Sequence, residues 1–137
     1  MTTREIADFV WLRWPPMRVP HVVDLVEWYG SQKLLGVVQD NGAIQGVAMI
    51  RIVDSKEDGA VHYKHNPDGK MVWVDLIASD NKMATAALIT MLWENWDKKP
   101  YIGFEKNRGS RVFVFPSRLL DKVLRRSVTA GLVTHRS

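Results

Sequence analysis

The sequence predicts a mixed α/β (α+β) protein, in which helices flank a mostly antiparallel sheet. Apolar residues recur at helical spacing near the N-terminus and again after residue 80. Between these segments, β-prone runs alternate with short polar turns. One strand–helix–strand unit in the second half adds a crossover to the antiparallel part. We expect residues 1–137 to form a single domain, which is an ordinary size.

Two helices are predicted at the N-terminus. Thr2-Thr3-Arg4-Glu5 has the S/T-x-x-E form of a capping box, which satisfies backbone N–H groups at a helix start. Pro15-Pro16 ends this first helix, because proline cannot continue the backbone hydrogen bonds. The second helix is predicted over residues 21–29, with Pro20 in its first turn and Gly30 at its C-terminal cap.

A β-hairpin is predicted next. Residues 34–39 and 43–53 have the composition of strands, and Asp40-Asn41-Gly42 between them tolerates the positive φ angles of a tight turn. After the hairpin, we expect residues 54–59 to form a polar turn and residues 60–63 a short strand.

The second half begins with a strand at residues 71–77 that is apolar on both faces. Ser79-Asp80-Asn81 is suited to cap the next helix, which is predicted from Lys82 to about Trp96. The remaining predicted elements are strands at 101–104 and 111–115, a helix at 118–126 and a frayed tail at 130–137.

The composition excludes several kinds of chemistry. The chain has no cysteine, which rules out disulfides, thiolate zinc sites and cysteine nucleophiles, and we expect no metal cofactor. No apolar run approaches the roughly 18 residues of a membrane helix. The N-terminus lacks the apolar core of a signal peptide. We therefore expect a cytoplasmic protein.

Charge is unevenly distributed along the chain. Residues 1–97 carry 9 Lys and Arg against 13 Asp and Glu, whereas residues 98–137 carry 10 against 2. The first part therefore has a net charge of −4 and the second of +8. A basic segment of this kind suits an acidic partner, such as a phosphate cofactor, an acidic carrier protein or nucleic acid, although it also forms an ordinary solvated face.

The order of predicted elements resembles the GNAT acyltransferase fold. That family has a V-shaped opening between its fourth and fifth strands, where the acyl donor enters. The matching strands here are residues 71–77 and residues 101–104. The resemblance implies an acyltransferase that takes an acyl group from a thioester donor.

Two short segments are similar to one branch, the haemolysin-activating lysine acyltransferases. They are Val10-Trp11-Leu12 and the strand Val72-Trp73-Val74-Asp75-Leu76-Ile77-Ala78. The resemblance implies that Asp75 and His21 are catalytic, with the histidine as base and the aspartate orienting it. Two structural roles stay open. Asp75 also suits a hydrogen-bonded position at a strand end, and His21 suits an exposed position in a first helical turn.

The same resemblance implies a donor site around the helix after residue 80. The implied donor contacts are Ile77, Ala78, Lys82, Met83, Ala84 and Asn107. The wider superfamily holds the CoA pyrophosphate on a glycine-containing turn at a helix start, but residues 80–87 contain no glycine, and Asp80 adds a negative charge. The donor is therefore expected to be acyl-CoA or an acyl carrier protein, and the toxin-activating branch uses the carrier.

Three functions stay open on the sequence. The first is acyl transfer from a carrier protein or CoA to an amine or lysine, which the Asp75 strand favours. The second is a catalytically degenerate GNAT-like binding or structural protein of the kind that small phages encode, which the absent glycine turn favours. The third is nucleic-acid binding by the basic residues after residue 97, and it ranks last because no nucleic-acid motif accompanies them.

Overall fold

The computed structural model describes residues 2–13, 19–61, 63–95, 99–106 and 111–119. The elements of the described residues are α1 (Thr3–Arg13), α2 (Val19–Ser31), β1 (Leu35–Asp40), β2 (Ala43–Val53), α3 (Lys56–Gly59), β3 (Met71–Ser79), α4 (Lys82–Asn95), β4 (Tyr101–Lys106) and β5 (Arg111–Pro116). The strands form one sheet in the order β1-β2-β3-β4-β5, and only β3 and β4 are parallel. The prediction of a mixed, mostly antiparallel sheet flanked by helices is confirmed.

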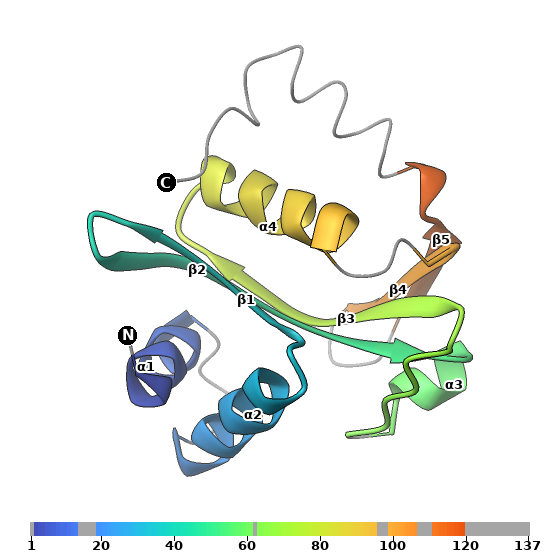
Figure 1. The fold of residues 1–137 in the computed structure, drawn as a ribbon, viewed down its shortest axis with the longest axis horizontal. Coiled ribbons are helices and arrows are strands. Elements are labelled where there is room, and N and C mark those ends of the chain that lie inside the picture. The colour runs from blue at the N-terminus through green and yellow to red at the C-terminus, as the bar shows by residue number, and fades with distance from the viewer. Residues whose placement is uncertain (1, 14–18, 62, 96–98, 107–110, 120–137) are drawn as a thin grey trace.

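Helices cover both faces of the sheet. Figure 1 shows α1 and α2 on one face and α4 on the other, with α3 beside the end of β2 and the start of β3. The main core lies between these layers and includes Val10, Val22, Val26, Ile50 and Leu88, each no more than 2% exposed. No described helix is long and apolar enough to cross a membrane.

The predicted ends of the first two helices are partly confirmed. The Thr2 hydroxyl accepts the Glu5 N–H at 3.1 Å, as a capping box requires. Helix α2 does not end at Gly30. It ends one residue later, at Ser31. Lys33 then adopts a left-handed φ of 59°, and Leu34 donates its N–H to the Tyr29 carbonyl at 2.8 Å. This is a Schellman motif with lysine at the usual glycine position.

The hairpin of β1 and β2 forms where the sequence predicts it. Asp40 pairs with Ala43, so Asn41 and Gly42 make a two-residue loop. Both loop residues have positive φ, 53° and 79°, which is the geometry of a type I′ turn.

The predicted strand at residues 60–63 is wrong. Residues 56–59 form the short helix α3, whose N-cap Ser55 accepts the Asp58 N–H at 3.4 Å, and Tyr63 has a positive φ of 61°. The conformation of this segment is set by a residue outside it. The guanidinium of Arg51 on β2 binds carbonyl oxygens of this segment, and so wraps the chain around one side chain instead of leaving it extended.

The last part of the chain is described only in part. Residues 111–116 form β5, so the predicted strand at 111–115 is confirmed. Arg118 and Leu119 are helical, and the rest of the predicted helix at 118–126 lies outside the described residues, as does the predicted tail at 130–137.

Two glycines pack against the indole of Trp73, which is 2% exposed. A Cβ added at Gly59 would lie 2.4 Å from ring atoms of Trp73, and one added at Gly103 would lie 2.9 Å from the same ring. Trp73 on β3 therefore holds α3 and β4 together through contacts that only glycine permits.

We expect Gly59→Ala to lower the free energy of unfolding by about 1–3 kcal/mol, because the added methyl group overpacks the Trp73 ring. Urea unfolding measures this change. Gly30→Ala is the matched control, since its Cβ would meet nothing closer than 3.9 Å and alanine favours the helix that contains it. Equal effects of the two substitutions would contradict the packing account.

Strands β3 and β4 pair over only four residues and then part. Their last partners are Val74 and Phe104, although β3 continues to Ser79. At this point Asp75 is an extra residue in β3, because Val74 pairs with Ile50 and Leu76 with Met49. Such a bulge bends a strand and increases its twist. We call the parting of β3 and β4 beyond Val74 and Phe104 the fork.

Candidate functional site

An apolar cavity opens from the fork on the α4 face of the sheet. Its volume is about 330 Å³. Its apolar lining consists of Val74, Leu76, Ile77, Ile89, Leu92, Ile102, Phe104 and Phe115. The two polar lining residues, Asp75 and Glu105, are the first residues beyond the last pair on each strand. The cavity is therefore apolar along its walls and acidic at the fork.

A second cavity of about 220 Å³ opens on the opposite face, beside α2. It is more polar, and His21, Tyr29 and Arg51 line it. Val74, Asp75, Leu76 and Glu105 line both cavities. The fork is thus accessible from both faces of the sheet.

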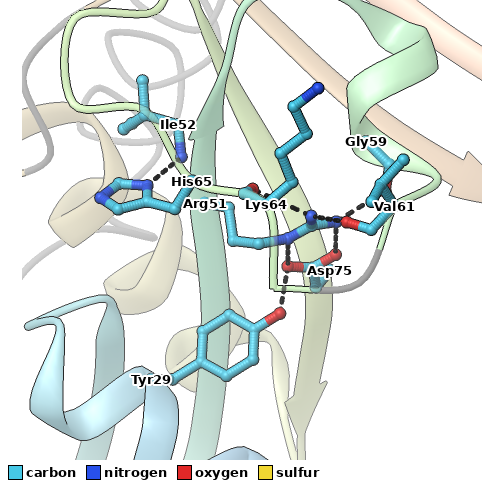
Figure 2. Close-up of polar contacts among 8 residues, drawn as sticks. All are labelled: Tyr29, Arg51, Ile52, Gly59, Val61, Lys64, His65 and Asp75. Carbon is cyan, nitrogen blue, oxygen red and sulfur yellow. Dashed lines mark hydrogen bonds and ion pairs between the residues drawn. The ribbon is translucent and has the colours of Figure 1, made fainter.

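Asp75 is the centre of a buried hydrogen-bond network on the α2 face (Figure 2). Its carboxylate makes a two-pronged ion pair with Arg51, with Nε to Oδ2 at 2.7 Å and Nη2 to Oδ1 at 2.8 Å. The hydroxyl of Tyr29 donates a further hydrogen bond to Oδ2. The network joins α2, β2 and β3 at the base of the fork.

All five N–H groups of Arg51 have acceptors. Two bind Asp75, and the others donate to the carbonyls of Val61 at 2.5 Å, Gly59 at 2.6 Å and Lys64 at 3.1 Å. Arg51 is 2% exposed, so each of these hydrogen bonds replaces one that the side chain would make to water in the unfolded chain. One arginine therefore satisfies both the Asp75 carboxylate and the loop after α3.

The surroundings of this network shift two pKa values. Burial and the Asp75 charge raise the pKa of Tyr29 far above its ordinary value, which keeps its hydroxyl a hydrogen-bond donor. Burial lowers the pKa of Arg51, but the hydrogen bonds and charge of Asp75 outweigh it and the net pKa is raised. The network therefore consists of the Arg51–Asp75 ion pair and the neutral Tyr29 hydroxyl, which donates a hydrogen bond to it.

The structure places the predicted catalytic pair around one cavity without a bond between them. His21 is exposed in the first turn of α2, and it lines the polar cavity together with Asp75. No hydrogen bond joins the two side chains, because the Asp75 oxygens bind Arg51 and Tyr29. His21, Leu25 and Tyr29 line the cavity from successive turns of α2.

The predicted donor contacts on β3 lie beyond the fork. Ile77 pairs with Ala48 and Ala78 with Val47, both on β2, whereas the other edge of β3 has no strand partner here among the described residues. Neighbouring residues of an inner strand direct their backbone groups to opposite sides. One of Ile77 and Ala78 therefore directs its N–H toward the fork. The Ile77 side chain is 36% exposed and lines the apolar cavity.

The predicted donor contacts on α4 surround a helix start that is already capped. Asn81 Oδ1 accepts the Ala84 N–H at 2.8 Å. Lys82 and Met83 are exposed, and Ala84 is buried against the sheet. The remaining predicted contact, Asn107, lies outside the described residues.

Asp80 adds a carboxylate beside the same helix start. It forms a two-pronged ion pair with Arg13 of α1, at 2.5 and 2.9 Å, and Arg13 stacks on the Phe9 ring. Hydrogen bonding to Arg13 lowers the pKa of Asp80. The first turn of α4 therefore presents a side-chain cap and an anion, where a pyrophosphate would need free N–H groups.

The prediction of site residues did not include Arg51, Tyr29 or Glu105. Arg51 carried the clearest signal, since it is the one charged residue within the apolar run of residues 46–53. A buried charge needs a partner of opposite sign on a neighbouring strand. Within the described ranges, no group of His, Asp and Glu is placed to hold a metal ion.

His65 lies next to this network and makes the stability of the fold depend on pH. Its Nδ1 accepts the Ile52 N–H at 3.0 Å, so that nitrogen carries no proton in the fold. Burial, followed by the charge of Arg51, lowers the pKa of His65 below its ordinary value of 6.5. The unfolded chain therefore binds this proton more readily than the folded one.

We expect the His65 contribution to stability to be complete above about pH 6.5 and to be lost as the pH falls from there through the lowered folded pKa. Urea unfolding between pH 5 and pH 8 measures it. His65→Gln keeps an acceptor but does not titrate, so its stability should fall less over this range. Parallel pH profiles for the two proteins would contradict the assignment.

Comparisons with protein-family models, with curated proteins and with solved structures find no match for this chain.

Proposed function

We propose that this chain is an acyltransferase-like protein, which moves an acyl group from the thioester of a carrier protein or CoA to an amine such as lysine. The observation that carries this proposal is the fork, which opens on both faces of the sheet at Asp75. The apolar cavity suits the acyl group, and the polar cavity suits the amine. The two substrates then meet at the gap between β3 and β4.

The proposed reaction is attack of the amine nitrogen on the thioester carbonyl. The neutral amine attacks, His21 takes one proton from its nitrogen, and the amide bond forms. The carbon–sulfur bond then breaks, and the protonated His21 returns the proton to the leaving sulfur, so that a thiol is released. An N–H of the unpaired edge of β3, from Ile77 or Ala78, donates to the developing oxyanion.

Asp75 acts in this proposal as a positioning residue. Its bonds to Tyr29 and Arg51 hold α2 against β2 and β3. His21 is two helical turns from Tyr29 on the same side of α2, so this anchor sets where His21 lies. Glu105 adds a carboxylate at the fork that attracts a cationic amine.

A carrier protein is favoured over CoA as the donor. The start of α4 has its Ala84 N–H capped by Asn81 and carries the Asp80 carboxylate, which would repel a pyrophosphate. Acyl carrier proteins are acidic, and residues 98–137 have a net charge of +8, from 10 basic and 2 acidic residues.

The second candidate is a binding protein of the same fold without catalysis, of the kind that small phages encode. One observation favours it. The Asp75 carboxylate is held by Arg51 and Tyr29 and does not orient His21. An enzyme that needs a His–Asp dyad would have lost it here.

The test is a transfer assay with octanoyl carrier protein and octanoyl-CoA, offered with lysine peptides and small amines. We expect thiol release that depends on the amine, a mass increase of the amine by one octanoyl group, and faster transfer from the carrier. Saturable binding of the thioester without any turnover would support the second candidate. No binding and no turnover with either donor would overturn both.

A further inference from the structure

We infer that the apolar cavity binds an unbranched aliphatic acyl chain of about eight to ten carbons, joined to a neutral thioester at the fork. The inference rests on the proposed function for the identity of the thioester. Its physical claim is about the length and the head group of the ligand, and binding alone tests it.

The side chains along the walls of the cavity are apolar, but the described residues leave several of them partly exposed to solvent. Val74, Leu76 and Ile89 are half-buried, and Ile77 is 36% exposed although it faces the same space. Contiguous apolar surface of this kind usually marks a binding site. An occupant without polar atoms along its length would remove this surface from water without leaving an unpaired group.

The volume sets the length of the occupant. A water molecule takes about 30 Å³ of liquid, and a methylene group is of similar size. The cavity of about 330 Å³ therefore has room for about eleven such groups, which corresponds to an acyl chain of about eight to ten carbons together with its thioester sulfur. A two-carbon acetyl group would leave most of the space empty. The cavity is therefore matched to a medium-length chain.

The charges at the fork set the head group. The two polar residues of the lining, Asp75 and Glu105, both carry carboxylates. Arg51 does not line this cavity, and its donors bind Asp75 and three carbonyls. Asp75 is neutralised by its ion pair with Arg51, so the remaining carboxylate of the lining is that of Glu105. A free fatty acid would meet this charge at its own carboxylate, whereas a thioester is uncharged. The fork therefore disfavours a free acid and accepts the uncharged thioester of the proposed function.

The test uses S-acyl pantetheines from two to fourteen carbons, with affinity measured by titration calorimetry on the full chain. These probes lack the nucleotide of CoA, so they measure the chain and the thioester only. Each methylene that enters the cavity should lower Kd about fourfold. The gain should stop at about eight to ten carbons, and free octanoate should bind more weakly than octanoyl pantetheine.

Three outcomes would overturn the inference. They are a Kd that does not depend on chain length, a gain that continues to fourteen carbons, and free octanoate binding as tightly as the thioester. Transfer of an acetyl group without any dependence on chain length would leave the proposed function standing and sink the inference. Binding that depends on chain length, without any turnover, would support the inference and contradict the proposed acyl transfer.

Ile89→Phe narrows the cavity from α4 and provides the matched variant test. We expect octanoyl pantetheine to bind at least tenfold more weakly and acetyl pantetheine to bind unchanged. Leu12→Phe on α1 is the control, since Leu12 is 66% exposed and lines neither cavity. If Ile89→Phe does not fold, Leu76→Phe narrows the same space from β3. Equal effects on the two chain lengths would contradict the assignment.

Discussion

Replacing Arg51 by methionine is expected to lower the free energy of unfolding by about 3–5 kcal/mol. Arg51 is 2% exposed, and methionine fills similar space without any donor. The substitution leaves the Asp75 carboxylate without its ion pair in a mostly buried site. It also removes the donors to the carbonyls of Gly59, Val61 and Lys64, which hold the loop after α3.

Arg4→Met is the matched control for this prediction. Arg4 also pairs with an aspartate, Asp8 at 3.2 Å, but both side chains are more than half exposed. Such a pair contributes about 0.5 kcal/mol or less. Chemical denaturation of both variants measures the contrast, and equal losses would contradict the role given to the buried pair.

A double substitution separates the ion pair from the loop contacts. Asp75→Leu in the Arg51→Met background removes the unpaired carboxylate, so it should restore part of the lost stability. The part that is not restored measures the loss of the three carbonyl contacts. No restoration at all would mean that the loop, and not the ion pair, accounts for the effect of Arg51.

The substitution His21→Ala is expected to reduce the rate of the proposed acyl transfer by about 10²–10⁴-fold, the usual contribution of a general base. Stability should change by about 0.5 kcal/mol or less, because the side chain is exposed and no described residue bonds to it. The measurement is kcat with octanoyl carrier protein and an amine, across pH 6 to pH 9.

Asp24→Ala is the control for His21, since Asp24 is exposed on the same helix and lines neither cavity. Tyr29→Phe should give a smaller loss of kcat, because it removes only the anchor between α2 and Asp75. If His21→Ala and Asp24→Ala have the same rate, His21 is not the base.

Local signals were sufficient to predict most of the fold. The hairpin at Asn41-Gly42 and the cap at Asn81 depend on residues next to each other in sequence. The strand at 60–63 failed because its conformation is set by Arg51, ten or so residues earlier, and not by its own composition. The left-handed lysine after α2 was missed for a related reason, since only glycine and asparagine give a reliable signal there.

The resemblance implied Asp75 and His21 as the candidate pair, and both line one cavity. Their catalytic role stays a prediction. The bulge at Asp75 and the parting of β3 from β4 depend on the register between strands, which no single strand reveals. Asp75 therefore has partners, Arg51 and Tyr29, that the sequence did not assign to it.

Amide hydrogen exchange of β3, with and without octanoyl pantetheine, tests most directly whether the fork is the thioester site. The backbone groups of β3 that face the fork pair with no strand in the described part of the chain, so their amides should exchange in the free protein. We expect the ligand to protect one of Ile77 and Ala78, with no change at the first turn of α4. Protection at Lys82–Ala84 and none on β3 would contradict this account.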